Sequence, residues 1–258
     1  MSGVIVPLVT PLTAEGAVCP ASVERLVESV RPDVTGLMPA LSSGEGWRLQ
    51  PWQWRDMVLL TRRFARGLPV LAGIELPTTG EVIERAALAR QLEVDAIVVA
   101  PPFAADLPQD QVRAHYQAIR AAAGLPIFLY NEPKLTGTAM TLETLIELCR
   151  SEGVVGIKDS SASLALTQGL VAAGTGVPVF QGWEHLCAAT TPGVAGYVLP
   201  LANLHAGLCR SMLQAPSPVL QAEIDRRCAE HALLDDQWYL GLKRELHRRG
   251  VIGDARPV

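Results

Sequence analysis

The middle of the chain repeats a short apolar run three times, AIVVAPPF at residues 96–103, PIFLYNEP at 126–133 and VVGIKDSS at 154–161. Each run is short and rich in apolar and β-branched residues, which is typical of a buried β-strand. Longer segments with apolar residues at helical spacing separate the runs. Strands that alternate with helices in this way predict parallel strands joined by crossover helices.

The same rhythm continues towards both ends of the chain. The other runs are GVIVPLVTP from Gly3, TGLMPALSS from Thr35, PVLAGIE from Pro69, PVFQGWE from Pro178 and GYVLPLAN from Gly196. The eight runs begin about 28 residues apart on average, which is the length of a strand, a helix and two loops. Eight such units predict a closed (β/α)8, or TIM, barrel. A doubly wound open sheet is the alternative, but it normally has a Gly-rich first turn, and no GxGxxG motif occurs here.

The intervening segments and the end of the chain show helical periodicity. Before residue 203 we expect helices over segments such as Pro20–Val30 and Thr141–Cys149. After Asn203 only helical patterns remain, over Ala206–Gln214, Val219–Leu234 and Gln237–Arg249. We therefore expect a single domain in which residues 1–205 form the barrel and residues 206–258 form a short C-terminal helical extension packed on it.

The composition narrows the class of protein. The 258 residues are 49% hydrophobic with a formal net charge of −4 and no basic run, so neither nucleic acid nor an anionic membrane is an expected partner. Five scattered cysteines form no metal or redox motif, and no apolar stretch reaches the ~18 residues of a membrane span. Without a targeting pattern at the first residues, we expect a soluble, cytoplasmic protein. The basic residues include only three lysines, Lys134, Lys158 and Lys243.

Active sites of such barrels lie where the strands end, so the polar residues that close each run are the candidates. They include Ser42, Ser43, Glu45, Glu75, Tyr130, Asn131, Lys158, Asp159, Trp183, Glu184, His185 and Asn203. Lys158 lies within an otherwise apolar strand, beside Gly156, whose small size would leave room for a ligand. A lysine with a pKa of about 10.4 is almost fully protonated at pH 7, so a nucleophilic role requires desolvation. A lysine that points outward or pairs with Asp159 is the structural alternative.

Two further residue types strengthen the chemical interpretation. Tyr130 ends the strand next to that of Lys158, where a phenol can pass protons to a carbinolamine or a substrate hydroxyl. The hydroxyls and amides of Ser42 and Ser43 precede Gly44 at a turn that can hold a small carboxylate. Packing at the rim is the alternative for Tyr130, and an ordinary turn is the alternative for the serines. Together, the three elements suit Schiff-base chemistry on a 2-oxo acid.

Three spaced motifs resemble the N-acetylneuraminate lyase and dihydrodipicolinate synthase superfamily of Schiff-base-forming aldolases. They are ALSSGEG at residues 40–46, YNEPKLTG at 130–137 and GIKDS at 156–160. The resemblance implies that Lys158 forms an imine with pyruvate, Tyr130 moves protons, Ser42 relays them, and Ser43 holds the pyruvate carboxylate. It implies no metal or organic cofactor.

The same resemblance assigns further contacts and exposes departures. Gly182, Glu184 and Val198, after the seventh run and in the eighth, are the expected substrate-binding residues, with Glu184 matching a residue of the lyase branch. The synthase branch has an arginine where this chain has Leu135, and a tyrosine donated across a dimer interface where this chain has Phe103 or Ala104. His185 and Pro200 depart from the lyase branch, and Glu132 is unusual within the YNxP motif.

The first hypothesis is an aldolase or lyase that cleaves or forms a 2-keto-3-deoxy (2-oxo-4-hydroxy) acid from pyruvate and a small aldehyde. Alternatives are a hydro-lyase of the same family, either dihydrodipicolinate synthase-like or a keto-deoxy-acid dehydratase, and a non-catalytic pyruvate-binding paralogue. A homodimer or homotetramer is expected. Among the three lysines, Lys158 is the predicted imine-forming residue, because it alone lies on an apolar strand. Lys134 is expected in the loop after the fifth run, near the substrate, and Lys243 on a C-terminal helix far from the barrel rim.

Overall fold

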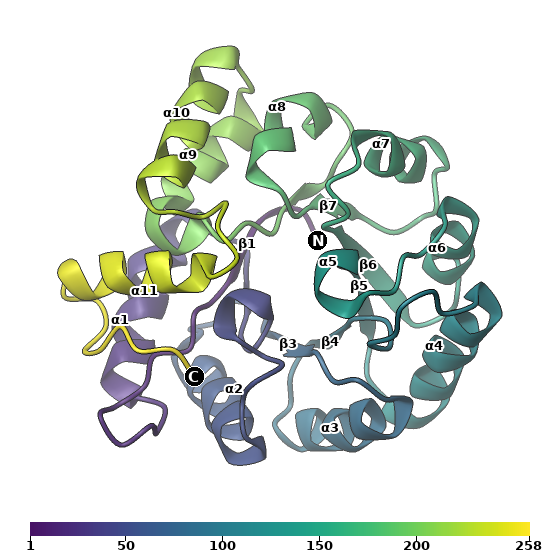
Figure 1. Ribbon diagram of the computed structural model, residues 1–258, viewed down its shortest axis with the longest axis horizontal. Coiled ribbons are helices and arrows are strands. Elements are labelled where there is room, and N and C mark those ends of the chain that lie inside the picture. Colours follow the sequence, from purple (N-terminus) through teal and green to yellow (C-terminus); the bar gives the residue numbers. More distant parts are fainter.

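Eight short strands alternate with helices along the whole chain in the computed structural model, which describes residues 1–258 (Figure 1). The strands are β1 Gly3–Pro7, β2 Gly36–Met38, β3 Leu71–Ile74, β4 Ala96–Val99, β5 Ile127–Asn131, β6 Val154–Asp159, β7 Val179–Gln181 and β8 Gly196–Tyr197. The α-helices are α1 Pro20–Val30, α2 Pro51–Phe64, α3 Thr79–Gln91, α4 Gln109–Ala123, α5 Pro133–Thr136, α6 Leu142–Cys149, α7 Leu164–Ala172, α8 Cys187–Thr190, α9 Ala202–Gln214, α10 Pro218–Glu230 and α11 Trp238–Arg248. Short 3-10 helices are η1 Arg31–Asp33, η2 Ser42–Gly44 and η3 Glu184–Leu186.

The strands form one parallel sheet that closes on itself. Hydrogen-bonded neighbours follow the order β2-β1-β8-β7-β6-β5-β4-β3. The remaining seam, between β2 and β3, is bridged in parallel between Leu37 and Val70, and the Leu37 amide donates to the Pro69 carbonyl at 2.9 Å. The helices surround this ring (Figure 1). The predicted (β/α)8 barrel is confirmed, and the doubly wound alternative is wrong.

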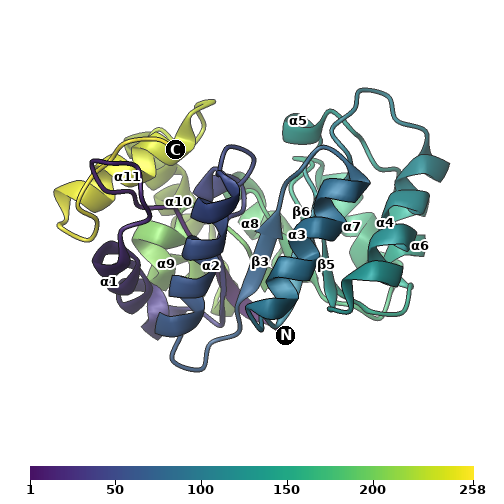
Figure 2. The ribbon, with the colours of Figure 1, turned by 90° about the horizontal axis from the view of Figure 1, so that it is seen from below.

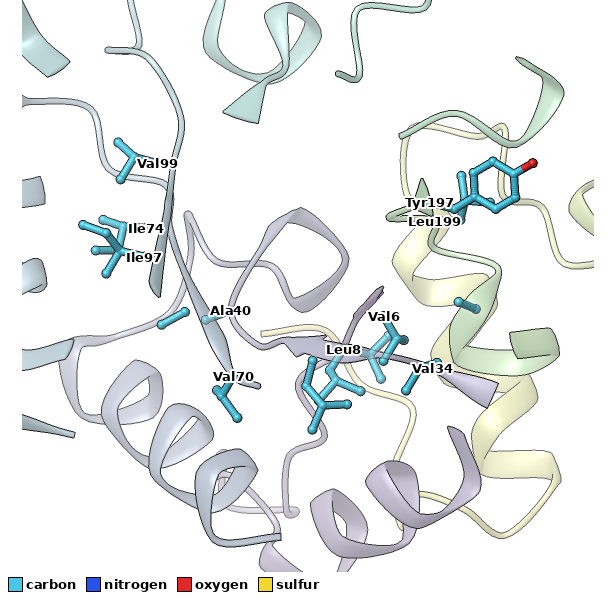
Figure 3. Close-up of a cluster of buried hydrophobic side chains, with 14 of the residues drawn as sticks. Val6, Leu8, Val34, Ala40, Val70, Ile74, Ile97, Val99, Tyr197 and Leu199 are labelled. Atoms are coloured by element: carbon cyan, nitrogen blue, oxygen red, sulfur yellow. The ribbon is translucent and has the colours of Figure 1, made fainter. Parts of the chain in front are cut away.

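Alternation along the strands separates two apolar layers. Odd and even positions of one strand face opposite sides, so Ile97 and Val99 of β4 pack outward among the helices while Ala96 and Val98 pack inside the barrel. Figure 3 shows part of the outer layer, which joins side chains far apart in sequence, such as Val6 and Val99.

Gly156 was expected to leave room for a ligand beside Lys158, but the space next to it holds an aromatic ring. A Cβ at this position would lie 2.3 Å from Cε2 of Phe128. The ring of Phe128 also lies 5.4 Å from that of Phe180, centroid to centroid, in the barrel interior. The glycine therefore makes room for an aromatic ring, and the expectation that it makes room for a ligand is wrong.

The segment after β8 completes the barrel and then folds back over it. Helix α9 packs beside β1, where Asn203 Nδ2 donates to the Pro7 carbonyl at 2.8 Å. The predicted boundary at residue 205 falls on the non-helical His205 within α9. Helix α10 ends at Glu230, earlier than the predicted Leu234, because Ala232 has a positive φ of 54°. We propose that the chain forms one domain, since the helices after residue 205 pack on the barrel.

The two ends of the barrel differ in what covers them. Figure 2 shows α5, α11 and the last residue at one end and the first residue at the other. The end with α5 is the carboxyl end of the strands, since α5 directly follows β5. This end holds the candidate site.

Candidate active site

Lys158 lies on β6 with its side chain inside the barrel, and only 2% of the residue is exposed. Its partner in the register with β5 is Tyr130. The ammonium nitrogen Nζ lies 3.3 Å from the Tyr130 hydroxyl and 4.3 Å from the centre of the phenol ring. The lysine thus points inward beside the tyrosine.

Asp159 does not pair with Lys158. Its Oδ1 accepts a hydrogen bond from Asn131 Nδ2 at 2.9 Å, and its Oδ2 accepts one from Thr167 Oγ1 at 2.6 Å. These bonds join β5, β6 and α7 on the outer side of the barrel. Asp159 therefore fixes the strand ends, and the ion-pair alternative for Lys158 is wrong.

Tyr130 is the centre of a hydrogen-bonded group. Its hydroxyl lies 2.9 Å from Ser42 Oγ and donates to Glu132 Oε2 at 3.1 Å. Ser42 is brought there by the η2 turn after β2, which is held by Thr10 Oγ1 donating to the Gly44 carbonyl at 2.7 Å. Ser42, Tyr130 and Lys158, predicted from three separate motifs, thus form one continuous hydrogen-bonded chain.

Burial changes the acidity of these groups. Desolvation lowers the pKa of Lys158 to about 8, although the carboxylates of Glu132, Glu75 and Glu184 oppose the shift. Desolvation also raises the pKa of Tyr130 well above its ordinary value, so the phenol stays protonated at neutral pH. A lysine amine with a pKa near 8 has an appreciable free-base fraction, as a nucleophile requires.

A cavity of about 210 Å³ opens over this group. Its lining residues are Ser42, Trp47, Tyr130, Glu132, Lys134, Leu135, Lys158, Ser160, Gly182, Trp183, Glu184, Pro200, Leu233, Leu234, Asp235, Asp236 and Trp238. Five of the seven predicted site residues are among them. The other two lie deeper: Ser43 is fully buried with no hydrogen-bond partner for its Oγ, and Val198 packs in the barrel interior.

Gly182 and Glu184 are held in place by their surroundings. A Cβ on Gly182 would lie 2.0 Å from Ser160 Oγ and 3.0 Å from Lys158 Cε, so a side chain here would displace Ser160 and press on the lysine. Glu184 is 4% exposed and accepts a hydrogen bond from the Leu201 amide at 3.0 Å. Burial raises the pKa of its carboxyl group.

The C-terminal part contributes a side of the cavity that the strand-end rule missed. Residues 231–236, here called the mouth segment, follow α10, and Trp238 begins α11. Trp238 packs on Trp47 with ring centres 6.4 Å apart. Lys134 Nζ forms an ion pair with Asp236 at 2.9 Å across the mouth. The one signal in the sequence was the aromatic pair Trp238 and Tyr239 after the turn, but their partner Trp47 lies almost 200 residues away.

Lys243 lies at the barrel rim, so its predicted remote position is wrong. It is fully buried, and its Nζ lies 2.5 Å from Oε1 of Glu45, the residue directly after η2. It also donates to the Arg256 carbonyl at 2.9 Å. The reason is that α11 folds back across the barrel end, which the helical pattern alone does not reveal. Both remaining lysines are thus engaged in ion pairs, and Lys158 has no such partner.

All five cysteines are unpaired. No helix has both the length and the apolar character that crossing a bilayer would demand.

The fold and the site together define a class: a (β/α)8 barrel enzyme with a buried lysine and a tyrosine at the carboxyl ends of its strands. The family model described as the dihydrodipicolinate synthetase family matches residues 1–257. The chain belongs to this family, as the resemblance implied, and it is an enzyme of the lyase class.

Individual relatives agree with this assignment. The 4-hydroxy-tetrahydrodipicolinate synthase of Acidiphilium cryptum is 30% identical over 217 residues, which cover 83% of this chain and 74% of that protein. The structure of dihydrodipicolinate synthase from Bacteroides thetaiotaomicron superposes with a TM-score of 0.89 at 29% identity, covering 97% of this chain and 90% of that one. The enzyme from Acinetobacter baumannii, solved in complex with pyruvate, has a TM-score of 0.89 at 25% identity, covering 100% and 91%.

Proposed function

We propose that the protein is a Schiff-base-dependent aldolase that cleaves or forms a 2-keto-3-deoxy acid from pyruvate and a small aldehyde. The observation that carries this proposal is the chain from Lys158 through Tyr130 to Ser42, with separations of 3.3 and 2.9 Å, at the base of the cavity. The relative from Acinetobacter baumannii that was solved with pyruvate supports a 2-oxo acid as the ligand.

The chemistry follows from the positions of these groups. The free amine of Lys158 attacks C2 of pyruvate, and the Tyr130 phenol gives a proton to the leaving hydroxyl. The resulting iminium draws electrons from C3, so either a C3 proton leaves or the C3–C4 bond of a 2-oxo-4-hydroxy acid breaks. Ser42, 2.9 Å from the phenol oxygen, is the proposed hydroxyl partner of Tyr130 in the proton relay, and Ser43 with its neighbouring amides is the proposed carboxylate clamp. No metal or organic cofactor enters these steps.

The charge of the cavity favours an aldehyde without an anionic group. Glu132, Glu184 and Asp235 line it, and Lys134 is paired with Asp236. Leu135 lines the wall where the synthase branch has an arginine. Once Lys158 carries pyruvate, no unpaired cation lines the cavity to hold a second carboxylate or a phosphate.

The charge of the cavity predicts a preference between a neutral aldehyde and its phosphate. With pyruvate as the partner, D-glyceraldehyde is expected to condense at least about tenfold more efficiently, by kcat/KM, than its 3-phosphate. The cavity offers the phosphate no unpaired cation, and its carboxylates repel the phosphate charge. The measurement is product formation by chromatography at fixed ionic strength. A preference for the phosphate would contradict the proposed aldehyde class.

The names of the curated relatives favour a hydro-lyase as the second candidate. It would form the same imine and then lose water. A panel of 2-keto-3-deoxy acids separates the two reactions, because cleavage releases pyruvate and dehydration does not. A non-catalytic pyruvate-binding role is the third possibility, and turnover of any panel member would eliminate it. Gly182, Glu184 and Val198 as substrate contacts, a homodimer or homotetramer, and a cytoplasmic location stay predictions.

Borohydride reduction in the presence of pyruvate tests the proposal as a whole. Borohydride reduces an imine to a stable secondary amine, so an aldolase of this kind acquires one covalent pyruvate-derived adduct and loses activity. A protein of unchanged mass after reduction would contradict the proposed function.

A further inference from the structure

The Tyr130 hydroxyl touches a carboxylate of its own strand end, and this contact is independent of the serine. Glu132 Oε2 accepts a hydrogen bond from the Tyr130 hydroxyl at 3.1 Å, and Ser42 Oγ lies 2.9 Å from the same phenol oxygen. Tyr130 is the only side chain to which Ser42 Oγ is hydrogen-bonded, so the hydrogen-bonded chain ends at Ser42. Lys158 Nζ also contacts the phenol oxygen, at 3.3 Å, but its nitrogen is bonded to the substrate once the imine has formed. At that stage Glu132 is the one ionisable side chain hydrogen-bonded to the phenol.

The position of Glu132 also suits a group that gains and loses a proton. Its side chain is half-buried, lines the cavity and faces Lys158 from the neighbouring strand end. Burial raises the pKa of its carboxyl group, whereas Lys158, Tyr130 and Lys134 work in the opposite direction. Glu75 adds a further carboxylate to the same surroundings.

We propose that Glu132 is the proton acceptor and donor of the Tyr130 relay, so that protons move within one chain between the substrate, the phenol and this carboxylate. The proposal rests on the proposed function, since it concerns the imine formed on Lys158. Glu132 acts through Tyr130 and is in this sense a relay residue.

The proposed step balances in atoms and charge. The iminium of pyruvate loses a C3 proton to the Tyr130 oxygen while the phenol proton passes to Glu132. The C3–H electron pair becomes the C2=C3 bond of the enamine, and the C=N π pair returns to nitrogen. The cationic iminium and the carboxylate become a neutral enamine and a carboxylic acid. When C3 attacks an aldehyde, the new C4 oxygen takes the proton from Tyr130, which recovers one from Glu132.

Exchange of the pyruvate methyl hydrogens for deuterium tests this step without an aldehyde. In D2O, the methyl signal of saturating pyruvate is followed by proton NMR with the wild-type protein, Glu132→Gln and Glu143→Gln. Glutamine preserves size and a hydrogen-bond acceptor for Tyr130 but cannot take its proton. Glu143 is exposed on α6 and supplies the matched loss of one carboxylate.

We expect Glu132→Gln to lower the exchange rate by about 100-fold or more, the range of general acid–base catalysis, while borohydride still traps the pyruvate adduct. Glu143→Gln should exchange like the wild type. The wild-type exchange rate should fall at acid pH as the carboxylate becomes protonated, and this limb should be absent in Glu132→Gln. The other titrating groups that face Glu132 are Lys158, Tyr130, Lys134 and Glu75, and both proteins retain them.

Two results would overturn the proposal. One is an exchange rate for Glu132→Gln within about threefold of the wild type, below the effect expected of a general base. The other is a parallel loss of trapping and exchange, which would mean that Glu132 serves imine formation instead. Absence of an adduct in the wild-type protein is a separate outcome, because it refutes the proposed function itself.

Discussion

Lys158 can attack a carbonyl only as the free amine, and its environment sets how often that form occurs. A pKa of about 8, caused by desolvation, leaves roughly one amine in ten unprotonated at pH 7. The reactive fraction rises with pH because the ammonium loses its proton, and the lowered pKa brings the pH at which it levels off down to just above 8. The initial rate of pyruvate trapping should therefore increase between pH 6 and 8 and flatten near pH 9. A flat profile over the whole range would contradict a titrating amine.

The Tyr130 phenol has a separate role from the lysine, and one atom tests it. Tyr130→Phe keeps the ring that lies beside Lys158 and removes the hydroxyl shared with Ser42 and Glu132. We expect turnover to fall by about 100-fold or more, because proton transfer is lost, while the adduct still forms slowly. Steady-state kinetics and trapping on the same preparation measure both effects. Unchanged turnover would show that the phenol only packs.

At the scale of elements, the strands depend on small residues where side chains from neighbouring strands meet. Gly156→Ala would place a Cβ 2.3 Å from the Phe128 ring, so we expect a loss of about 1–3 kcal/mol in the free energy of unfolding from overpacking. Gly80→Ala in α3 is the control, since nothing lies within 4 Å of its Cβ position. Urea denaturation measures both variants. Equal midpoints would contradict the close packing.

Strand alternation explains why so much of the site could be predicted from the sequence. Lys158 lies two residues from Gly156 and Tyr130 two residues from Phe128, so all four face the barrel interior. The register of the parallel strands β5 and β6 then places Tyr130 beside Lys158. The mouth segment could not be predicted in this way, because its position depends on docking of α10 and α11 across the barrel end. The purpose of Gly156 also escaped prediction, since local sequence does not show which ring on β5 fills the space.

At the scale of the whole molecule, a buried ion pair joins the C-terminal helix α11 to the turn after β2. Lys243 of α11 and Glu45 after η2 are both fully buried. Lys243→Met removes the buried cation beside Glu45 Oε1 and leaves the carboxylate only the partly exposed Arg48 at 3.7 Å and the Val258 amide at 2.9 Å. We therefore expect a loss of about 3–5 kcal/mol in the free energy of unfolding. Lys134→Met breaks the exposed pair with Asp236 and should leave the free energy of unfolding nearly unchanged, because solvent screens the pair.

Urea denaturation of the two lysine variants tests this difference. If Lys243→Met fails to fold, the double variant Lys243→Met/Glu45→Met provides the comparison, because removing both charges should restore folding. Equal stability of Lys243→Met and Lys134→Met would contradict the structural role assigned to the buried pair.

Of the three lysines, only Lys158 lies in the barrel interior without an ion-pair partner. Borohydride reduction with pyruvate, followed by protease digestion and peptide mass mapping, identifies which lysine formed the imine. We expect a single pyruvate-derived adduct on Lys158, with Lys134 and Lys243 unmodified. An unmodified Lys158, or an adduct on either of the other two lysines, would contradict the central claim.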